Sequence, residues 1–249
     1  MNATPELPDQ LDVSLIIACY NEEQVLETNL KRVNDILALT RYSYEIILID
    51  DCSQDSTRQL IERITPQYER VKVILHASNK GRGQTVRDGI LESRGEVVGF
   101  IDIDLETSEC YLPAMIAKVK AGFDVVIAWR IYRFHFHSIL RYILSRGYVF
   151  LVRMLLGMNF KDTEAGCKFF NRSRIIPVLE EIEDHHWFWD TEVMVRSFLK
   201  KYRICEMPTL FIRNREVSST VRVFADTIYY LGKIFRFRSV VKELRHASS

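Results

Sequence analysis

Short apolar runs that each end in a cluster of polar side chains are the feature that most restricts the fold of this chain. The runs are rich in β-branched residues, and those at 13–19 and 44–49 are each followed by a helical pattern. Such runs are typical of buried parallel strands joined by crossover helices. With further strands expected at 71–75, 97–101 and 124–128, the sequence predicts an α/β protein with a mostly parallel central sheet.

The polar clusters are expected to lie side by side. In an open α/β sheet, ligands bind beyond the carboxyl ends of the strands. Four clusters follow predicted strands, and they cover residues 20–23, 50–55, 79–83 and 102–106. The sequence therefore predicts a binding site along this one edge of the sheet.

Three carboxylates, Asp102, Asp104 and Glu106, stand at alternate positions directly after the strand at 97–101. In extended chain such side chains share one face, where uncompensated negative charge is costly. A divalent cation would compensate that charge, and hard oxygen ligands suit Mg²⁺ or Mn²⁺ better than zinc. The alternative is an acidic, solvated turn, because such turns are common after strands.

The sequence pieces 18–23, 49–55, 79–81 and 102–104, in this order, resemble the nucleotide-diphospho-sugar domain of family 2 glycosyltransferases. The second half is similar to dolichol-phosphate mannose synthases and other polyprenyl-phosphate glycosyltransferases, although Glu106 stands where that subgroup has Gln. The pieces that carry this second likeness are 129–130, 141 with 145–146, 162–168, 189–192 and 206–208. The resemblance implies a glycosyltransferase A-type fold with amphipathic helices in the C-terminal half.

The resemblance also implies roles for individual residues. The nucleotide-sugar would be bound by residues of all four clusters, namely Ala18, Tyr20, Asn21, Glu22, Asp51, Lys80, Gly81 and Asp102. The metal ion, Mg²⁺ or Mn²⁺, would be held by Asp102, Asp104 and Glu106. Catalysis is assigned to Asp104, Arg130 and Glu192, and arginines would hold the acceptor phosphate, namely Arg130, Arg141, Arg146, Arg213 and Arg215.

Each role has a structural alternative. Asn21 and Asp51 could cap the helices that follow them, and any of the arginines could simply face water. Asp190 could cap a helix that begins near 189, with Glu192 in its first turn.

The expected reaction is inverting transfer of a hexose from a nucleotide-diphospho-sugar, of the GDP-mannose or UDP-glucose class, to a polyprenyl phosphate. A phosphate nucleophile is largely ionised at pH 7 and needs no base. The alternative acceptor is a hydroxyl group of a glycan or glycolipid, which requires a carboxylate base such as Asp190 or Glu192. A non-catalytic protein that keeps the fold is a third hypothesis, and the intact Asp102 and Asp104 argue against it.

Charge divides the chain into two halves. Residues 1–125 carry 13 Lys and Arg against 21 Asp and Glu, a balance of −8, whereas residues 126–249 carry 21 against 12, a balance of +9. We expect one continuous catalytic domain with a nucleotide-sugar-binding half at 1–125 and an acceptor-binding half at 126–249. The basic residues are interleaved with aliphatic runs and match no nucleic-acid motif, so nucleic acid is not an expected partner.

Two basic amphipathic stretches predict contact with a membrane. They cover residues 142–158 and 222–236, and neither is apolar enough to span a bilayer. The alternative is that both helices pack on the core and show their arginines to water. The beginning of the sequence lacks a signal-peptide pattern, and five cysteines without paired spacing favour a reducing compartment. We therefore expect a peripheral protein on the cytoplasmic face of a membrane, bound directly or through a small membrane partner protein.

Overall fold

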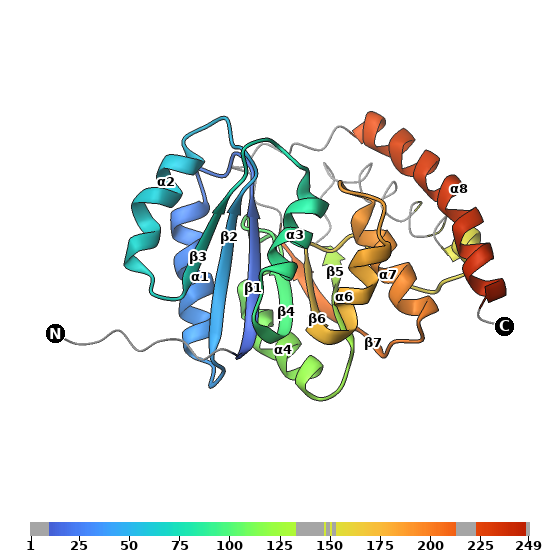
Figure 1. Ribbon diagram of the computed structural model, residues 1–249, viewed down its shortest axis with the longest axis horizontal. Coiled ribbons are helices and arrows are strands. Elements are labelled where there is room, and N and C mark those ends of the chain that lie inside the picture. Colours follow the sequence, from blue (N-terminus) through green and yellow to red (C-terminus); the bar gives the residue numbers. More distant parts are fainter. Residues whose placement is uncertain (1–9, 133–146, 148–149, 151–152, 213–222, 248–249) are drawn as a thin grey trace.

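The computed structural model describes residues 10–132, 147, 150, 153–212 and 223–247. Seven strands form one sheet, flanked by helices on both faces (Figure 1). The strands are β1 (Leu11–Cys19), β2 (Tyr44–Asp50), β3 (Val71–Leu75), β4 (Gly95–Ile101), β5 (Val125–Tyr132), β6 (Cys167–Asn171) and β7 (Ile204–Phe211). The described helices are α1 (Leu26–Ala38), α2 (Thr57–Ile64), α3 (Arg82–Leu91), α4 (Leu112–Lys120), α6 (Arg172–Glu181), α7 (Trp189–Leu199) and α8 (Val223–Ala247), with short 3₁₀ helices at Thr65–Gln67 and Glu109–Tyr111.

The sheet has the order β3-β2-β1-β4-β6-β5-β7 and is mostly parallel, as the sequence predicts. Only β6 among the described strands runs antiparallel to its neighbours, β4 and β5. Every residue of β2 is buried, which explains why its sequence between Glu45 and Asp50 is a continuous apolar run rather than an alternating one. The predicted halves meet at the start of β5, and both contribute strands to this one sheet.

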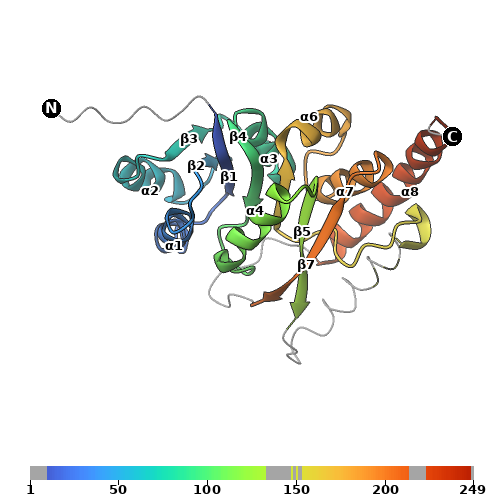
Figure 2. The same cartoon turned by 90° about the horizontal axis from the view of Figure 1, so that it is seen from below.

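Helices cover both faces of the sheet. Figure 2 shows α1 and α4 on one face and α3 and α6 on the other. Helix α1 buries one stripe of side chains at helical spacing, formed by Leu26, Leu30, Val33 and Leu37. On the opposite face Gly89 lets α3 approach β1 closely, because a Cβ atom there would come within 2.7 Å of the Ile16 side chain. Close packing on both faces fixes the strand ends that carry the polar clusters.

The C-terminal half differs from the sequence expectation in the orientation of α8. Of the polar stripe predicted at 222–236, Tyr229 and Lys233 turn inward and bond to Asp184, while Phe235 is 58% exposed. Helix α8 lies outside α7 (Figure 1) and packs on the core through Ile234, Phe237 and Val241. The packed-core alternative therefore describes the inner face of α8, and most of the predicted stretch at 142–158 lies outside the described residues.

None of the helices in the described part of the chain combines the length and the apolar character that crossing a bilayer requires.

Candidate active site

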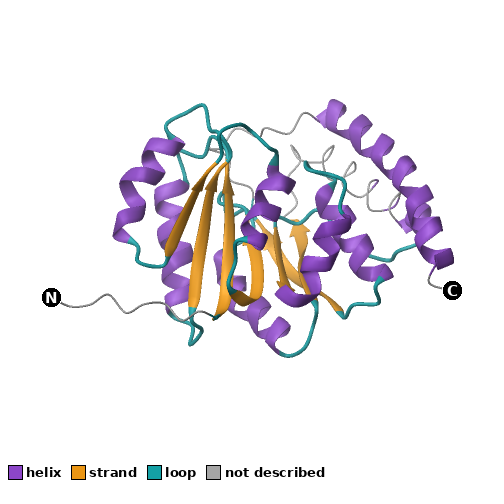
Figure 3. Ribbon diagram, in the orientation of Figure 1, coloured by secondary structure: helices purple, strands orange, loops and turns teal. Residues whose placement is uncertain are grey.

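Loops gather beyond the carboxyl ends of β1, β2 and β3, where the arrowheads of these strands point in Figure 3. Ala18 is the second-last residue of β1, and Tyr20, directly after the strand, is 38% exposed. The chain then turns at Asn21, whose φ of 60° lies in the left-handed region that Asn tolerates better than most residues. The predicted nucleotide-sugar-binding loop thus opens onto the expected edge of the sheet.

The loop after β1 is joined to the loop after β2 by several hydrogen bonds. The Asn21 amide donates to Ser53 Oγ (3.0 Å), and Asn21 Oδ1 accepts from the Gln54 amide (2.7 Å). The Glu22 amide donates to Thr57 Oγ1 (2.7 Å). Helix α1 begins later, with Val25 as its N-cap. The helix-capping alternative for Asn21 is therefore wrong, and its side chain fixes the neighbouring loop instead.

Asp51 is buried and anchors the turn before α3. Its two carboxylate oxygens accept hydrogen bonds from the Lys80 and Gly81 amides, each at 2.9 Å. His76 Nδ1 lies 2.8 Å from Asp51 Oδ1. The N-cap of α2 is Ser56, so Asp51 does not cap that helix. The structure brings Asp51, Lys80 and Gly81 together, and it gives the Asp51 carboxylate the role of holding this turn in place.

Helix α3 begins directly after the turn, against the segment 183–189. Gly81 has a φ of 88°, and a Cβ atom on it would come within 2.2 Å of His186 Nδ1. The Gln84 amide donates to the His185 carbonyl oxygen (2.9 Å), so one of the free amides at the start of α3 already has a partner. Lys80 Nζ bonds to Asp88 Oδ2 (2.7 Å). The helix start beside the predicted nucleotide-sugar-binding residues Lys80 and Gly81 is therefore partly covered by the 183–189 segment.

The acidic cluster after β4 forms a turn rather than extended chain. Strand β4 ends at Ile101, the Leu105 amide donates to the Asp102 carbonyl (3.1 Å), and Leu105 has a φ of 51°. The expectation that Asp102, Asp104 and Glu106 share one extended face is therefore wrong. Within the described ranges, no group of three or more His, Cys, Asp or Glu side chains is arranged to hold a metal ion.

Asp102 and Asp104 are each held by backbone contacts. The Glu106 amide donates to Asp104 Oδ1 (3.2 Å), and the Asp102 amide donates to the Gly166 carbonyl (2.9 Å). A Cβ atom on Gly166 would come within 1.7 Å of Asp102 Oδ2. Only glycine at 166 leaves room for the Asp102 carboxylate, so the piece 162–168 lies directly against the acidic cluster.

Negative charge accumulates where the Glu22 loop meets this turn. Burial, followed by repulsion from Asp104 and Asp102, raises the pKa of Glu22 to about 8. Burial, followed by repulsion from Asp102 and Glu106, raises the pKa of Asp104 to about 7. Glu22 Oε2 is buried without a hydrogen-bond partner among the described residues. Negative charge is therefore concentrated where the Glu22 loop meets the acidic turn, and each of these carboxylates raises the cost of ionising the others.

We expect the metal-free protein, kept in chelator, to lose thermal stability as the pH rises from about 5 to 8. Raised carboxyl pKa values mean that the folded protein binds more protons than the unfolded chain in this range, so deprotonation favours unfolding. Scanning calorimetry across this range would measure the slope. Glu22→Gln should make it shallower, whereas Glu62→Gln, on the exposed side of α2, should not; a Tm that is independent of pH would contradict the prediction.

An ionic network links the acidic turn to α7, and it is largely buried except at Asp102. Arg82 donates through Nε and Nη2 to Asp102 Oδ1 (3.0 and 2.7 Å) and through Nη1 to Asp190 Oδ2. Its guanidinium carbon lies 5.1 Å from the centroid of the Phe100 ring and 5.7 Å from that of Trp187. Lys168 is fully buried and bonds to Asp190 Oδ1 and to the Ala165 carbonyl. Asp190 is thus neutralised by two cations.

Sequence reasoning missed both of these cations. Arg82 stands between Gly81 and Gly83, and Lys168 lies among the apolar residues 167, 169 and 170 of strand β6. A lysine inside a buried strand is rare unless it is paired, which was the signal for a buried partner. The capping alternative for Asp190 is wrong, because Phe188 is the N-cap of α7.

Arg130 and Glu192 have partners that differ from the expected ones. Strand β5 runs past Arg130 to Tyr132, and Arg130 pairs with Asp162 through Nε (2.6 Å) and Nη2 (2.9 Å). Glu192 is buried and accepts hydrogen bonds from Arg196 Nε (2.8 Å) and from the Asp184 amide (3.1 Å). Their catalytic roles stay predictions, as do those of the acceptor arginines outside the described residues, Arg141, Arg146, Arg213 and Arg215.

The fold and the position of the site together define an α/β protein with a candidate ligand site at the carboxyl edge of its sheet. Solved structures share this fold: glucosyl-3-phosphoglycerate synthase from Mycobacterium tuberculosis, in complex with Mn²⁺, uridine-diphosphate and glucosyl-3-phosphoglycerate, aligns with a TM-score of 0.65 at 15% identity, over 97% of this chain and 85% of that one. Residues 14–177 match the family model described as glycosyl transferase family 2. The chain belongs to glycosyl transferase family 2.

Curated relatives include a dolichyl-phosphate beta-glucosyltransferase of Saccharomyces cerevisiae, 27% identical over 80% of this chain and 66% of the yeast protein. A dolichol-phosphate mannosyltransferase of Pyrococcus furiosus is 29% identical over 91% of this chain and 63% of its own length. Glycosyltransferase AglD of Haloferax volcanii is 28% identical over 80% of this chain and 32% of its own length. The chain therefore spans from about a third to about two thirds of these relatives.

Proposed function

We propose that this chain moves a hexose from a nucleotide-diphospho-sugar to a polyprenyl phosphate, with inversion at the sugar C1. The observation that carries the proposal is the set of carboxylates formed by Glu22, Asp102 and Asp104 at the carboxyl edge of the sheet, two of them with raised pKa values. The likeness to dolichyl-phosphate transferases over 80% or more of the chain supports the acceptor class.

The residues fit a divalent ion. Mg²⁺ is usually bound by one or two carboxylates together with substrate phosphates, so the absence of a three-residue cluster from the described chain does not conflict with it. Asp102 and Asp104 would hold Mg²⁺ or Mn²⁺. Glu22, which has an oxygen without a hydrogen-bond partner among the described residues, is repelled by the same two aspartates. Glu106 is proposed as a third ligand or as a supporting group. When bound, the ion would neutralise the charge that grows on the leaving diphosphate.

The remaining proposed contacts with the donor do not involve the metal ion. We propose that the loop with Ala18, Tyr20 and Asn21 holds the nucleoside, and that Asp51 orients the Lys80–Gly81 turn toward the diphosphate. The proposed donor belongs to the GDP-mannose or the UDP-glucose class.

Acceptor phosphate would be held by arginines, whose planar guanidinium groups suit phosphate oxygens. We propose Arg130 for this role together with Arg141, Arg146, Arg213 and Arg215. The guanidinium carbon of Arg130 lies 5.7 Å from the ring centroid of Tyr132, and the guanidinium group pairs with Asp162. The acceptor phosphate would therefore bind an arginine that Asp162 already orients.

The state of the carboxylates on α7 favours a phosphate acceptor over a hydroxyl. A hydroxyl acceptor needs a base with a free oxygen. Both oxygens of Asp190 accept charged hydrogen bonds, from Arg82 and Lys168, and Glu192 pairs with Arg196. An ionised phosphate needs no such base.

Because polyprenyl chains lie in bilayers, we also propose a peripheral position on the cytoplasmic face of a membrane, through direct contact or a membrane partner.

The test presents two acceptors in the same vesicles: polyprenyl phosphate and the matching polyprenol. Labelled UDP-glucose and GDP-mannose are each supplied with Mg²⁺ or Mn²⁺. We expect one donor to label the phosphate lipid alone, and only in the presence of metal. Label on the polyprenol, or no lipid label from either donor, would contradict the proposal.

A further inference from the structure

Asp184 is a buried carboxylate with four hydrogen bonds, at a place that the transfer reaction does not explain. It is 2% exposed. One oxygen accepts from the His186 amide (2.9 Å) and the Trp189 amide (3.2 Å), and the other from Tyr229 Oη (2.7 Å) and Lys233 Nζ (2.7 Å). Burial alone would raise the pKa of Asp184, but the bonds from Lys233, Tyr229 and the His186 amide hold it below its ordinary value.

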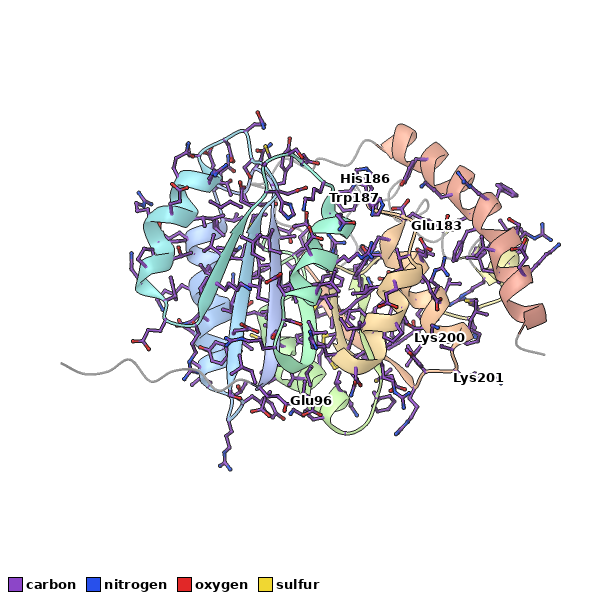
Figure 4. The ribbon with its side chains drawn as sticks, in the orientation of Figure 1. Glu96, Glu183, His186, Trp187, Lys200 and Lys201 are labelled. Atoms are coloured by element: carbon purple, nitrogen blue, oxygen red, sulfur yellow. The ribbon has the colours of Figure 1, made fainter. Side chains whose placement is uncertain are left out.

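The two oxygens of Asp184 thus join two parts of the molecule. One side is the segment 184–189, which shapes the donor site. The His185 carbonyl takes the Gln84 amide of α3, and His186 packs against Gly81, whose own amide is bound by Asp51. Figure 4 shows His186 and Trp187 near the start of α3, at the end of the molecule opposite Glu96.

The other side is α8, which packs on the core through Ile234, Phe237 and Val241. The Phe237 ring packs on Phe188 with the centroids 5.6 Å apart, and Arg196 lies 5.5 Å from the same ring. Tyr229 and Lys233 add the polar contact with Asp184, one turn apart on the inner face of the helix. The Asp184 carboxylate therefore contributes both to the docking of α8 and to the order of the 184–189 segment.

We infer that Asp184 is a positioning residue: held by Tyr229 and Lys233, it keeps the 184–189 segment against the Gly81 turn, so that docking of α8 sets the affinity for the nucleotide. This inference rests on the proposed function, because it assumes a nucleotide at the Asp51 and Gly81 turn. Without Lys233 the buried carboxylate loses its counter-charge, and the bonds that it accepts from the His186 and Trp189 amides no longer have a fixed acceptor.

The experiment uses the full chain with the double substitution Tyr229→Phe and Lys233→Met, which removes both polar contacts and keeps the side-chain volumes. Dissociation constants for UDP and GDP are measured by calorimetry in Mn²⁺, and hydrogen exchange is followed at residues 184–189. We expect roughly tenfold weaker binding of the preferred nucleotide, equivalent to ~1.4 kcal/mol, together with faster exchange in this segment. Lys233→Arg, which keeps the charge, should restore both.

Lys242→Met is the matched control, since Lys242 is an exposed lysine of the same helix. It should leave affinity and exchange unchanged. Unaltered nucleotide affinity in the double variant would overturn the inference, even if α8 loosens, because the contact would then be structural only. A parent protein that binds neither UDP nor GDP would contradict the proposed function instead, and the exchange of residues 184–189 would still decide whether Asp184 orders that segment.

Discussion

Replacing Asp104 with Asn should lower hexose transfer at least roughly 10²-fold while leaving the fold intact, as is typical when one electrostatic contact to the leaving group is lost. The substitution keeps the volume of the side chain and its bond from the Glu106 amide, and it removes only the charge. In metal-free protein it should even relieve the repulsion that raises the pKa of Asp104 to about 7. Steady-state kinetics with saturating donor and Mn²⁺ measure the loss.

Glu96→Gln is the matched control for this substitution. Glu96 lies at the opposite end of β4 and pairs there with Lys120 (2.8 Å), so its amide variant should transfer at the parent rate. Figure 4 shows this residue far from His186 and Trp187. Full activity of Asp104→Asn, or full activity of the parent in excess chelator, would end the metal-dependent interpretation.

Asp190→Asn should destabilise the protein by about 3–5 kcal/mol, which is the usual cost of breaking a buried ion pair by removing one partner. Lys168 is 0% exposed, and Asp190 is its carboxylate partner, so the substitution would leave a buried ammonium group with neutral acceptors and no ion-pair partner. Arg82 would at the same time lose one of its two carboxylates. Urea unfolding, followed by fluorescence and by circular dichroism, gives the free energy of unfolding.

Lys168→Met provides the comparison. It removes the ammonium group, and Asp190 keeps its bond to Arg82, so no charge is left unpaired. We expect a clearly smaller loss of stability than for Asp190→Asn. Equal unfolding midpoints for Asp190→Asn and the parent protein would mean that the network contributes no net stability, and would remove the argument that Asp190 is too well paired to act as a base.

Much of the fold was predictable because strand signals are local. The run at 71–75 coincides with β3, and those at 13–19, 44–49 and 97–101 fall within β1, β2 and β4. Apolar runs of this kind report burial on both faces of a parallel sheet, which needs no knowledge of partners. Strand β6 gave no comparable signal, because its antiparallel pairing with β4 and β5 depends on residues far away in the sequence.

Part of the site was predictable for the same reason. The sequence by itself determined that Asp51, the Lys80–Gly81 turn and the acids at 102 and 104 lie at one edge of the sheet, since parallel strands bring their carboxyl ends together. It also determined the family, through motifs that are short and local.

Only the tertiary structure decided how the charges are paired. Arg82 meets Asp190 across 108 positions of the chain, and Asp184 meets Tyr229 across 45. Such contacts depend on how α3, α7 and α8 pack, and residue spacing carries no record of them. Only the tertiary structure also decided the shape of the acidic turn. The positive φ of Leu105 breaks the extended geometry that acids at the alternate positions 102, 104 and 106 suggest. A carboxylate can be located from the sequence, but the partner that neutralises it is chosen by packing, because charge pairing acts over a few ångströms of space whatever the separation along the chain.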